Sequence, residues 1–470
     1  MRTTQGIPTF HLTILALLVH SIAAWFSVGW HHPDEHYQLI EFTYAITGEK
    51  NAATLPMEFG EEMRPSIQVW LTYVLIKCAG SLQLTNPFLI AFLLRLLTAV
   101  LCIVASLQFH RALVFSEVPL QRTHLLLLFF GWCLVYVHVR YSSETWSAAL
   151  FIWGVSLLLR SKYNLWTGVL LGLSFVFRFQ MGFALFGVGA YLLVQRISIK
   201  HLLYLSTGGL LSIGFASFLD FLFYGNWVFT PYVYFYQNIV NKVAAGFGIS
   251  PWYWYFTQTV EQLIPPFSLL VIAGCILLLY QRAYRLIGYA LFFFVMGHSM
   301  VGHKELRFIF PMLFFAPLAA VLAWQWVYER LKQERNKRRW TALARMFIAV
   351  NAVALLIIMF KPAHELANVY KIMYQLPAGS TMYYEHRNPF MSGTNQATFY
   401  KKNDLILIPL SVYKPVTNAF VITEKSLVPR IPHATLSRVY TSIPDWLYAF
   451  NVNNWIGRSN QYTLYKITSD

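Results

Sequence analysis

Long apolar segments recur along most of the first 360 residues, and they constrain the fold more than any other feature of the chain. The first, about Phe10 to Val28, ends at Gly29-Trp30 without a small-residue cleavage pattern, so we expect a retained helix and not a signal peptide. Ten further runs are read as membrane spans: 88–109, 122–138, 143–159, 164–178, 180–195, 201–223, 264–280, 285–301, 308–328 and 342–360. They predict an all-α polytopic membrane protein with about eleven transmembrane helices.

Composition excludes other classes of protein. Hydrophobic residues make up 57% of the 470 residues and charged residues only 12%, whereas soluble domains carry about 25% charged residues. A net charge of +16 can indicate nucleic-acid binding, but in a membrane protein the same excess is expected in cytoplasmic loops. The four cysteines lack the spacing of a disulfide framework or a zinc site.

One short segment decides the predicted topology. Residues Ser66 to Ala79 include Gln68, Tyr73 and Lys77 and are too few to cross a bilayer, so we expect an interfacial helix. The N-terminus and the Lys/Arg-rich connection 329–339 then face the cytoplasm, as the positive-inside rule requires, and the C-terminus lies outside.

The domains follow from this topology. We expect a transmembrane domain over residues 1–361, which includes the first external loop (29–87) and a second large one (224–263). After it, short β-prone runs such as Leu405 to Ile408, separated by prolines, predict a small soluble mixed α/β domain over 362–470.

Ionisable residues at the predicted external ends of spans are candidates for a site, because charge near hydrocarbon is costly. Asp34 and Glu35 lie between histidines just after the first span, and paired acids there suit a general base, a metal or a proton relay. Alternatively, this is a solvated loop in which Asp34 caps a helix that begins at Glu35.

Basic residues form the complementary group. His303, Lys304 and Arg307 would share one helical turn and suit a phosphate, although Lys304 and Arg307 could instead reach the interface paired with Glu305. Three further features lie on the same predicted face, each with a structural alternative: Arg140 with Glu144, Arg178, and the aromatic run that includes Trp252 and Trp254. The gathering of all of them on one face favours an external active site.

These motifs make the chain similar to the mannosyltransferases of glycosyltransferase family 22, within the GT-C superfamily, and most of all to the enzymes that add the third mannose of the GPI anchor. The residues that carry the resemblance are Pro33-Asp34-Glu35 with Gln38, Arg64, Arg140 with Glu144, Phe177-Arg178, Tyr224-Gly225-Asn226-Trp227, the run 251–256, and His303-Lys304-Glu305-Leu306-Arg307-Phe308 with Pro311.

The resemblance implies inverting transfer of mannose from a polyprenyl or dolichyl phosphate donor to a lipid-linked or membrane glycan on the non-cytoplasmic face, without a metal or another cofactor. Asp34 would be the base, with Glu35 beside it. His303, Lys304 and Arg307 would bind the donor phosphate, with Arg64 and Arg178 as further donor ligands. Gln38, Arg140, Glu144, Glu305, Trp252 and Trp254 would support the site.

Several alternatives stay open at this stage. The donor sugar could be another polyprenyl-phosphate-linked residue. A secondary transporter would also be polytopic and basic, but it would carry its ions at mid-membrane depth and show an internal repeat. The chain has no Asn-x-Ser/Thr sequon, which favours a bacterial inner membrane over the endoplasmic reticulum.

Overall fold

The computed structural model describes residues 9–48, 54–393, 395–424, 429–459 and 461–469. The extreme N-terminus, predicted to be cytoplasmic, and residues 49–53 of the first external loop lie outside the described residues. The chain divides into two compact units: unit 1 is Met1–Trp25, Glu61–Leu71 and Leu94–Phe360, and unit 2 is Phe26–Gly60, Thr72–Leu93 and Lys361–Asp470.

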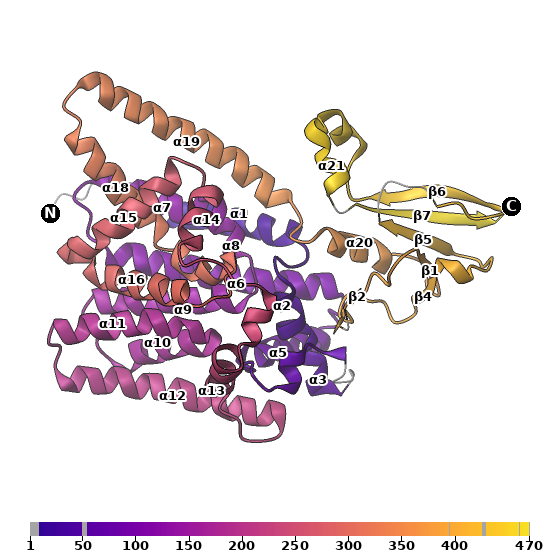
Figure 1. Ribbon diagram of the computed structural model, residues 1–470, viewed down its shortest axis with the longest axis horizontal. Helices are drawn as coiled ribbons and strands as arrows, with labels where there is room; N and C mark the ends of the chain where they lie inside the picture. The colour runs from indigo at the N-terminus through magenta and orange to yellow at the C-terminus, as the bar shows by residue number, and fades with distance from the viewer. Residues whose placement is uncertain (1–8, 49–53, 394, 425–428, 460, 470) are drawn as a thin grey trace. The chain divides into compact units, whose positions relative to one another are not determined.

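Unit 1 is built from apolar helices, several of which lie side by side in Figure 1. Its main helices are α1 (Thr9–Phe26), α6 (Pro87–Ala112), α7 (Val118–Phe130), α8 (Trp132–His138), α9 (Ser143–Leu159), α10 (Leu165–Phe177), α11 (Gly182–Val194), α12 (Ile199–Tyr224), α15 (Phe267–Tyr280), α16 (Arg285–Met300), α18 (Ala316–Arg330) and α19 (Glu334–Phe360). Glycines let some pairs approach closely: a Cβ on Gly168 of α10 would lie 2.2 Å from the Leu205 carbonyl of α12. Such contacts are typical of helices packed in a membrane.

Membrane-spanning helices are present, as predicted. Among the described residues, 4 helical stretches are long and apolar enough to cross a membrane, namely α1, α6, α12 and Glu334–Tyr374. The number is up to 7 if each of three bent helix pairs is one span, and α9, α10 and Phe179–Val194 are shorter apolar helices. The count of about eleven stays a prediction.

The connections of unit 1 contain short helices: η3 (Phe179–Met181), α13 (Thr230–Phe235), η4 (Tyr236–Val240), η5 (Val243–Phe247), α14 (Trp254–Gln262), η6 (Arg282–Tyr284), η7 (Leu306–Ile309) and α17 (Phe310–Leu313). A helix does form over the segment predicted to be interfacial, as α5 (Ile67–Ser81). Its predicted position at the interface stays a prediction.

Unit 2 combines most of the loop predicted to be external, without Glu61–Leu71, with the C-terminal residues. The loop contains α2 (Pro33–His36), η1 (Tyr37–Glu41), α3 (Thr43–Thr47) and α4 (Met57–Gly60). The C-terminal part contains α20 (Glu365–Tyr374), β1 (Thr381–Tyr384), β2 (Met391–Ser392), β3 (Asn395–Gln396), β4 (Ile406–Pro409), η8 (Leu410–Val412), β5 (Ala419–Glu424), β6 (Ala434–Thr441), η9 (Asp445–Phe450), η10 (Val452–Asn454), α21 (Trp455–Arg458) and β7 (Tyr462–Ser469).

The five-stranded sheet of unit 2 has the order β4-β1-β5-β7-β6. β1 pairs in parallel with β4 and β5, whereas β7 is antiparallel to β5 and β6. The central β5 is buried over most of its length, which explains its continuous apolar run. This sheet and its helices confirm the predicted mixed α/β character of the C-terminal residues.

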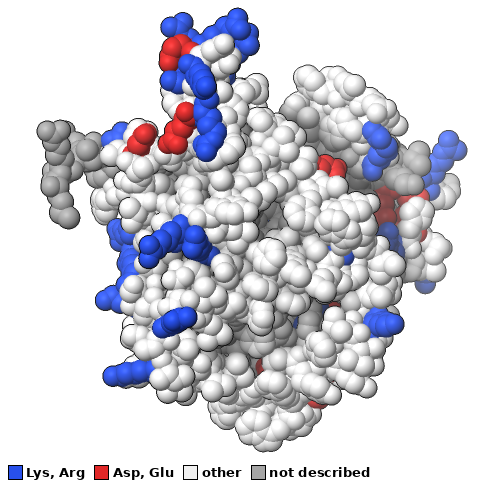
Figure 2. All heavy atoms as spheres, turned by 60° about the vertical axis from the view of Figure 1, so that its left-hand side comes forward, with Lys and Arg blue, Asp and Glu red and all other residues white. Residues whose placement is uncertain are grey.

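Several basic residues of unit 1 that were predicted to be external are buried, although Lys242, also predicted to be external, is exposed. Arg111, Arg160 and Arg196, in connections predicted to be cytoplasmic, are exposed, and Figure 2 shows exposed blue side chains grouped at several places on this surface. In contrast, Arg140, Arg178, Lys304 and Arg307, predicted to lie at external span ends, are buried. Exposed cations suit an orientation signal, whereas buried cations need specific partners.

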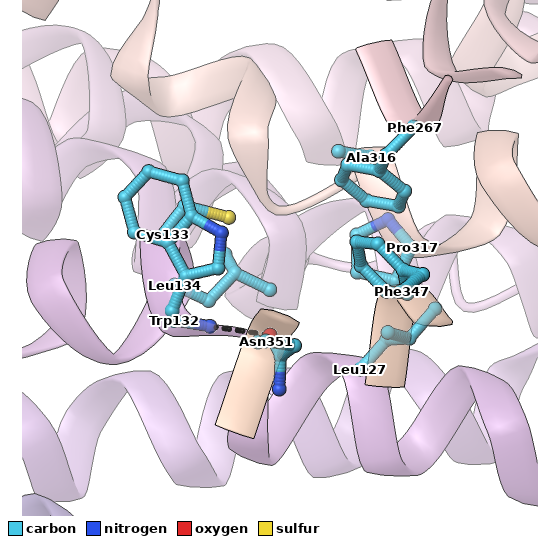
Figure 3. A pocket seen from close by; sticks show the side chains of 10 residues that line it. Leu127, Trp132, Cys133, Leu134, Phe267, Ala316, Pro317, Phe347 and Asn351 are labelled. Atoms are coloured by element: carbon cyan, nitrogen blue, oxygen red, sulfur yellow. Dashed lines mark hydrogen bonds between the residues drawn. The ribbon is translucent and has the colours of Figure 1, made fainter. Parts of the chain in front are cut away.

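A small apolar crevice lies where α7 gives way to α8 at Gly131 (Figure 3), and these helices are bent by 48°. The side chain of Asn351 in α19 binds backbone groups on both sides of this break. Its Oδ1 accepts a hydrogen bond from Trp132 N at 3.0 Å (Figure 3), and its Nδ2 donates to Phe130 O at 2.9 Å. The space inside this crevice, about 10 Å³, is just enough to hold one water molecule. The crevice is therefore too small to bind a sugar.

Candidate active site

The centre of the basic group in unit 1 is the carboxylate of Glu144, which two arginines bind. Glu144 lies in the first turn of α9, because the Ser142 hydroxyl caps that helix by accepting a hydrogen bond from Thr145 N. Its Oε1 lies 3.0 Å from Arg178 Nη1 and 3.4 Å from Arg307 Nη1. All three side chains are buried, and their ion pairs offset part of the cost of burying their charges.

Arg307 also binds a second carboxylate. Its Nε lies 2.5 Å from Glu305 Oε2, and the other oxygen of Glu305 lies 2.9 Å from His303 Nε2. The ring of Phe308 takes part as well, since the guanidinium carbons of Arg178 and Arg307 lie 5.0 and 5.3 Å from its centroid. The two carboxylates and the Phe308 ring thus keep Arg178 and Arg307 close together despite their like charge.

The cluster of Glu144, Arg178, Glu305 and Arg307 still contains hydrogen-bond donors for which the described residues offer no acceptor. Within the part of the chain that the structure describes, the buried Nε and Nη2 of Arg178 have no hydrogen-bond partner. The ion pairs join Arg178 and Arg307 to Glu144 and Glu305, whereas Lys304 donates to backbone carbonyls. Buried guanidinium donors without acceptors favour an anion as the missing partner.

His303 and Lys304 hold a neighbouring loop. Lys304 Nζ donates to Ser250 O at 3.0 Å and to Val301 O, and His303 Nδ1 lies 3.0 Å from Gly248 O. Loss of water contact lowers the pKa of the Lys304 amine. In this structure the two residues therefore fasten residues 248–250 to the connection after α16, and the aromatic residues Trp252 and Trp254 follow directly.

Three further residues of unit 1 that were predicted to support the site differ in exposure. Arg140 is fully buried, with its guanidinium carbon 5.2 Å from the centroid of the Tyr136 ring. Trp252 is 67% exposed, whereas Trp254 is half-buried at the start of α14.

Sequence reasoning missed a buried aspartate that binds Ser66, two positions after Arg64. Asp220, buried in α12, accepts hydrogen bonds at 2.7 Å from Ser66 N, Ser66 Oγ and Thr230 Oγ1. The Tyr224 hydroxyl donates to Arg64 O at 2.8 Å, and the Arg64 guanidinium lies over the Tyr234 ring. A lone aspartate in the apolar run 201–223 was a signal that could have identified Asp220.

The acidic pair lies in unit 2, on α2. The N-cap of this helix is His32, whose Nδ1 accepts from Asp34 N, and Pro33 occupies the first turn. The alternative in which Asp34 caps a helix starting at Glu35 is therefore wrong. Glu35 is buried and accepts from His31 N at 3.0 Å, whereas the Asp34 side chain keeps 22% exposure.

Gln38 anchors the turn that follows. Its Nε2 donates to Glu58 Oε1 of α4 at 2.9 Å, which joins two parts of the first loop. Asp34, Glu35 and Gln38 thus lie in unit 2, whereas the structure brings Glu144, Arg178, Glu305 and Arg307 together in unit 1. Among the residues described, no three His, Cys, Asp or Glu side chains are grouped to hold a metal ion.

Comparison with known proteins gives one family. The model of the Alg9-like mannosyltransferase family matches residues 12–392. Similar curated proteins include GPI alpha-1,2-mannosyltransferase 3 of Danio rerio, 33% identical over 123 residues, and mannosyltransferase APTG1 of Arabidopsis thaliana, 36% identical over 115 residues. These matches cover 25% and 24% of this chain but only 23% and 20% of those relatives.

A solved structure shares the fold along nearly the whole chain. It is the crystal structure of ArnT from Cupriavidus metallidurans bound to undecaprenyl phosphate, with a TM-score of 0.57 and 14% sequence identity. The alignment covers 97% of this chain and 98% of that one. At this identity the likeness shows the GT-C membrane fold alone.

Proposed function

Because the chain belongs to the Alg9-like mannosyltransferase family, we propose that it is an inverting glycosyltransferase that uses a polyprenyl or dolichyl phosphate mannose donor. The acceptor is a lipid-linked or membrane glycan, and transfer takes place on the non-cytoplasmic face. The relatives named as GPI mannosyltransferases and the ArnT structure bound to undecaprenyl phosphate support this choice of chemistry.

The observation that carries the proposal is the pair of arginines on Glu144. When the bond between the sugar C1 and the phosphate oxygen breaks, the polyprenyl phosphate leaves with the electron pair and gains negative charge. Arg178 and Arg307 are fixed in advance by Glu144, Glu305 and Phe308, so they need no reorganisation to stabilise this charge. The hydrogen-bond donors of Arg178 that lack described partners are the groups offered to the phosphate.

The acceptor hydroxyl needs a base on the opposite side of the sugar. Asp34 takes this role: it accepts the hydroxyl proton while the acceptor oxygen forms the new bond to C1. Its partial exposure suits contact with an acceptor, whereas Glu35 is buried and bonded to the loop backbone. No metal or other cofactor is needed in this scheme.

Orientation and location belong to the same proposal. The exposure of cations in the connections predicted to be cytoplasmic supports a cytoplasmic N-terminus and an external C-terminal domain. The lack of sequons favours a bacterial inner membrane, with the endoplasmic reticulum as the alternative.

The test is transfer from labelled polyprenyl-phosphate mannose by the purified protein in detergent, with a panel of lipid-linked acceptors. We expect Asp34→Asn to lower kcat by about 10²–10⁴-fold, the usual contribution of a general base. Asp404→Asn, a change at an exposed aspartate of the same unit, serves as the control. Full transfer by Asp34→Asn would remove Asp34 from its role.

The cationic site is tested separately. Lys304→Ala combined with Arg307→Ala should abolish donor-dependent transfer, whereas Lys332→Ala with Arg335→Ala, both exposed, should leave it unchanged. Transfer that survives the first pair would refute the phosphate site, and transfer lost on adding a chelator would refute a metal-free reaction. Donors with other sugars in the same assay decide the sugar.

A further inference from the structure

The helix that carries Asp34 continues into a buried π-helical turn, η1. Turns of this kind are rare and occur frequently at functional sites. It ends at Glu41, whose side chain is fully buried. A buried carboxylate is costly unless it is paired, so its partners identify what it does.

Glu41 joins two segments that are far apart in the sequence. Its Oε1 lies 2.9 Å from His36 Nε2, at the end of α2, and accepts a hydrogen bond from the backbone of Phe399 at 3.0 Å. An ionised carboxylate only accepts, so the contact requires that His36 carries its proton on Nε2. Through this one oxygen, the C-terminal domain contacts the residue two positions after Asp34.

The ring of His36 is also held by aromatic stacking. It stacks on Trp30 with centroids 4.4 Å apart and planes 16° apart, and on Tyr400 at 5.3 Å and 12°. Trp30 belongs to the first loop, whereas Tyr400 follows Phe399 in the C-terminal domain. Two rings and one carboxylate therefore restrict the position of this histidine.

A second set of contacts joins the start of the loop that bears Asp34 to the C-terminal domain. Val28 O accepts hydrogen bonds from Ala363 N and His364 N, at 2.9 and 3.2 Å. Gly29 has a φ of +92°, and a Cβ there would lie 2.7 Å from the Cβ of His364, so only glycine fits. The loop that bears Asp34 is thus fixed to the C-terminal domain on both sides of α2.

We infer that Glu41 is a positioning residue through which the C-terminal domain holds His36, and with it α2, in the orientation that Asp34 needs. This gives the C-terminal domain a role in catalysis without any contact between it and the substrate. The inference rests on the proposed function, because it assumes Asp34 as the base.

The test is Glu41→Gln in the full-length protein, with Glu385→Gln, an exposed glutamate of the same unit, as the matched control. Glutamine keeps the shape of the side chain but weakens both hydrogen bonds to Glu41. We expect kcat to fall about ten- to hundred-fold, as for a small misplacement of a catalytic group, with the donor KM changed less than about twofold. Hydrogen–deuterium exchange should rise in residues 33–41 and 397–400.

A second variant covers the case in which Glu41→Gln does not fold. Tyr400→Leu removes one of the two stacked rings and leaves the charges in place. It should lower kcat in the same way, and the double variant should lose less than the product of the two single losses, because both act through His36.

The outcomes separate the two proposals. If Asp34→Asn is inactive but Glu41→Gln and Tyr400→Leu keep the wild-type kcat, the positioning role is refuted and the proposed function stands. A lower yield of folded protein with unchanged kcat per folded molecule also refutes it, since the role is then only structural. If Asp34→Asn is fully active, the base assignment fails, and raised exchange in 33–41 then shows only that the two segments are coupled.

Discussion

At the scale of single residues, three buried carboxylates have partners that the structure identifies. Glu144 forms ion pairs with two arginines, Glu41 joins His36 to Phe399, and Asp220 receives three hydrogen bonds. Because burying an unpaired charge is costly, each of these carboxylates must shape the residues around it. Of the three, the sequence had marked only Glu144 as a candidate for the site.

Asp220 gives a prediction at this scale. Asp220→Ala removes the acceptor of Ser66 N and Thr230 Oγ1, and a buried unsatisfied donor costs about 1–3 kcal/mol, so the melting temperature should fall. Asp220→Asn should fall less, because its amide oxygen still accepts. Thermal unfolding followed by tryptophan fluorescence measures this, with Glu329→Ala, an exposed change in unit 1, as the control. Equal melting temperatures for Asp220→Ala and the wild type would show that the contacts are not formed.

At the scale of elements, close packing of helices through small residues decides where the site residues lie. Gly274 of α15 faces α18 so closely that a Cβ would lie 1.9 Å from Ala319 O, inside the van der Waals radii. α18 follows directly after the 303–307 motif and α17. The spacing of these helices is therefore linked to the position of the cationic cluster.

The corresponding prediction compares two glycines. Gly274→Ala forces α15 and α18 apart and should destabilise the protein by about 1–3 kcal/mol, as overpacking usually does. Gly189→Ala is the matched control, because a Cβ at Gly189 of α11 meets nothing within 4 Å. Melting temperatures of the two variants in detergent test the difference, and an equal effect of both would contradict the tight contact.

At the scale of the whole molecule, the distribution of basic residues leads to a prediction about the orientation of the protein in the membrane. Lys337 lies in the basic N-terminal part of α19, and Glu385 lies in the C-terminal domain. With Cys78, the exposed native cysteine, changed to serine, a membrane-impermeant maleimide added from outside should label Glu385→Cys. It should label Lys337→Cys only after permeabilisation. Labelling of Lys337→Cys in intact cells would reverse the proposed orientation.

Much of the architecture could be predicted from the sequence. Apolar runs directly indicate membrane helices, and the β-prone runs at 405–408 and 419–422 correspond to β4 and β5. The cap of α2 was misjudged because the sequence did not reveal that His32 could accept from the backbone in the place of Asp34. Asp220 was missed because its partners are 154 residues earlier in the chain, at Ser66, and 10 residues later, at Thr230.

By itself, the sequence determined the class of protein, the mixed C-terminal fold and which ionisable residues are candidates for the site, since hydropathy and residue chemistry are local properties. Only the tertiary structure decided which charges meet. It placed Arg178 and Arg307 on one carboxylate, turned Lys304 toward backbone carbonyls, and joined Glu41 to Phe399 across 358 positions. The physical reason is that a buried charge is stabilised by whichever partner the packing brings within reach, and chain order does not specify that partner.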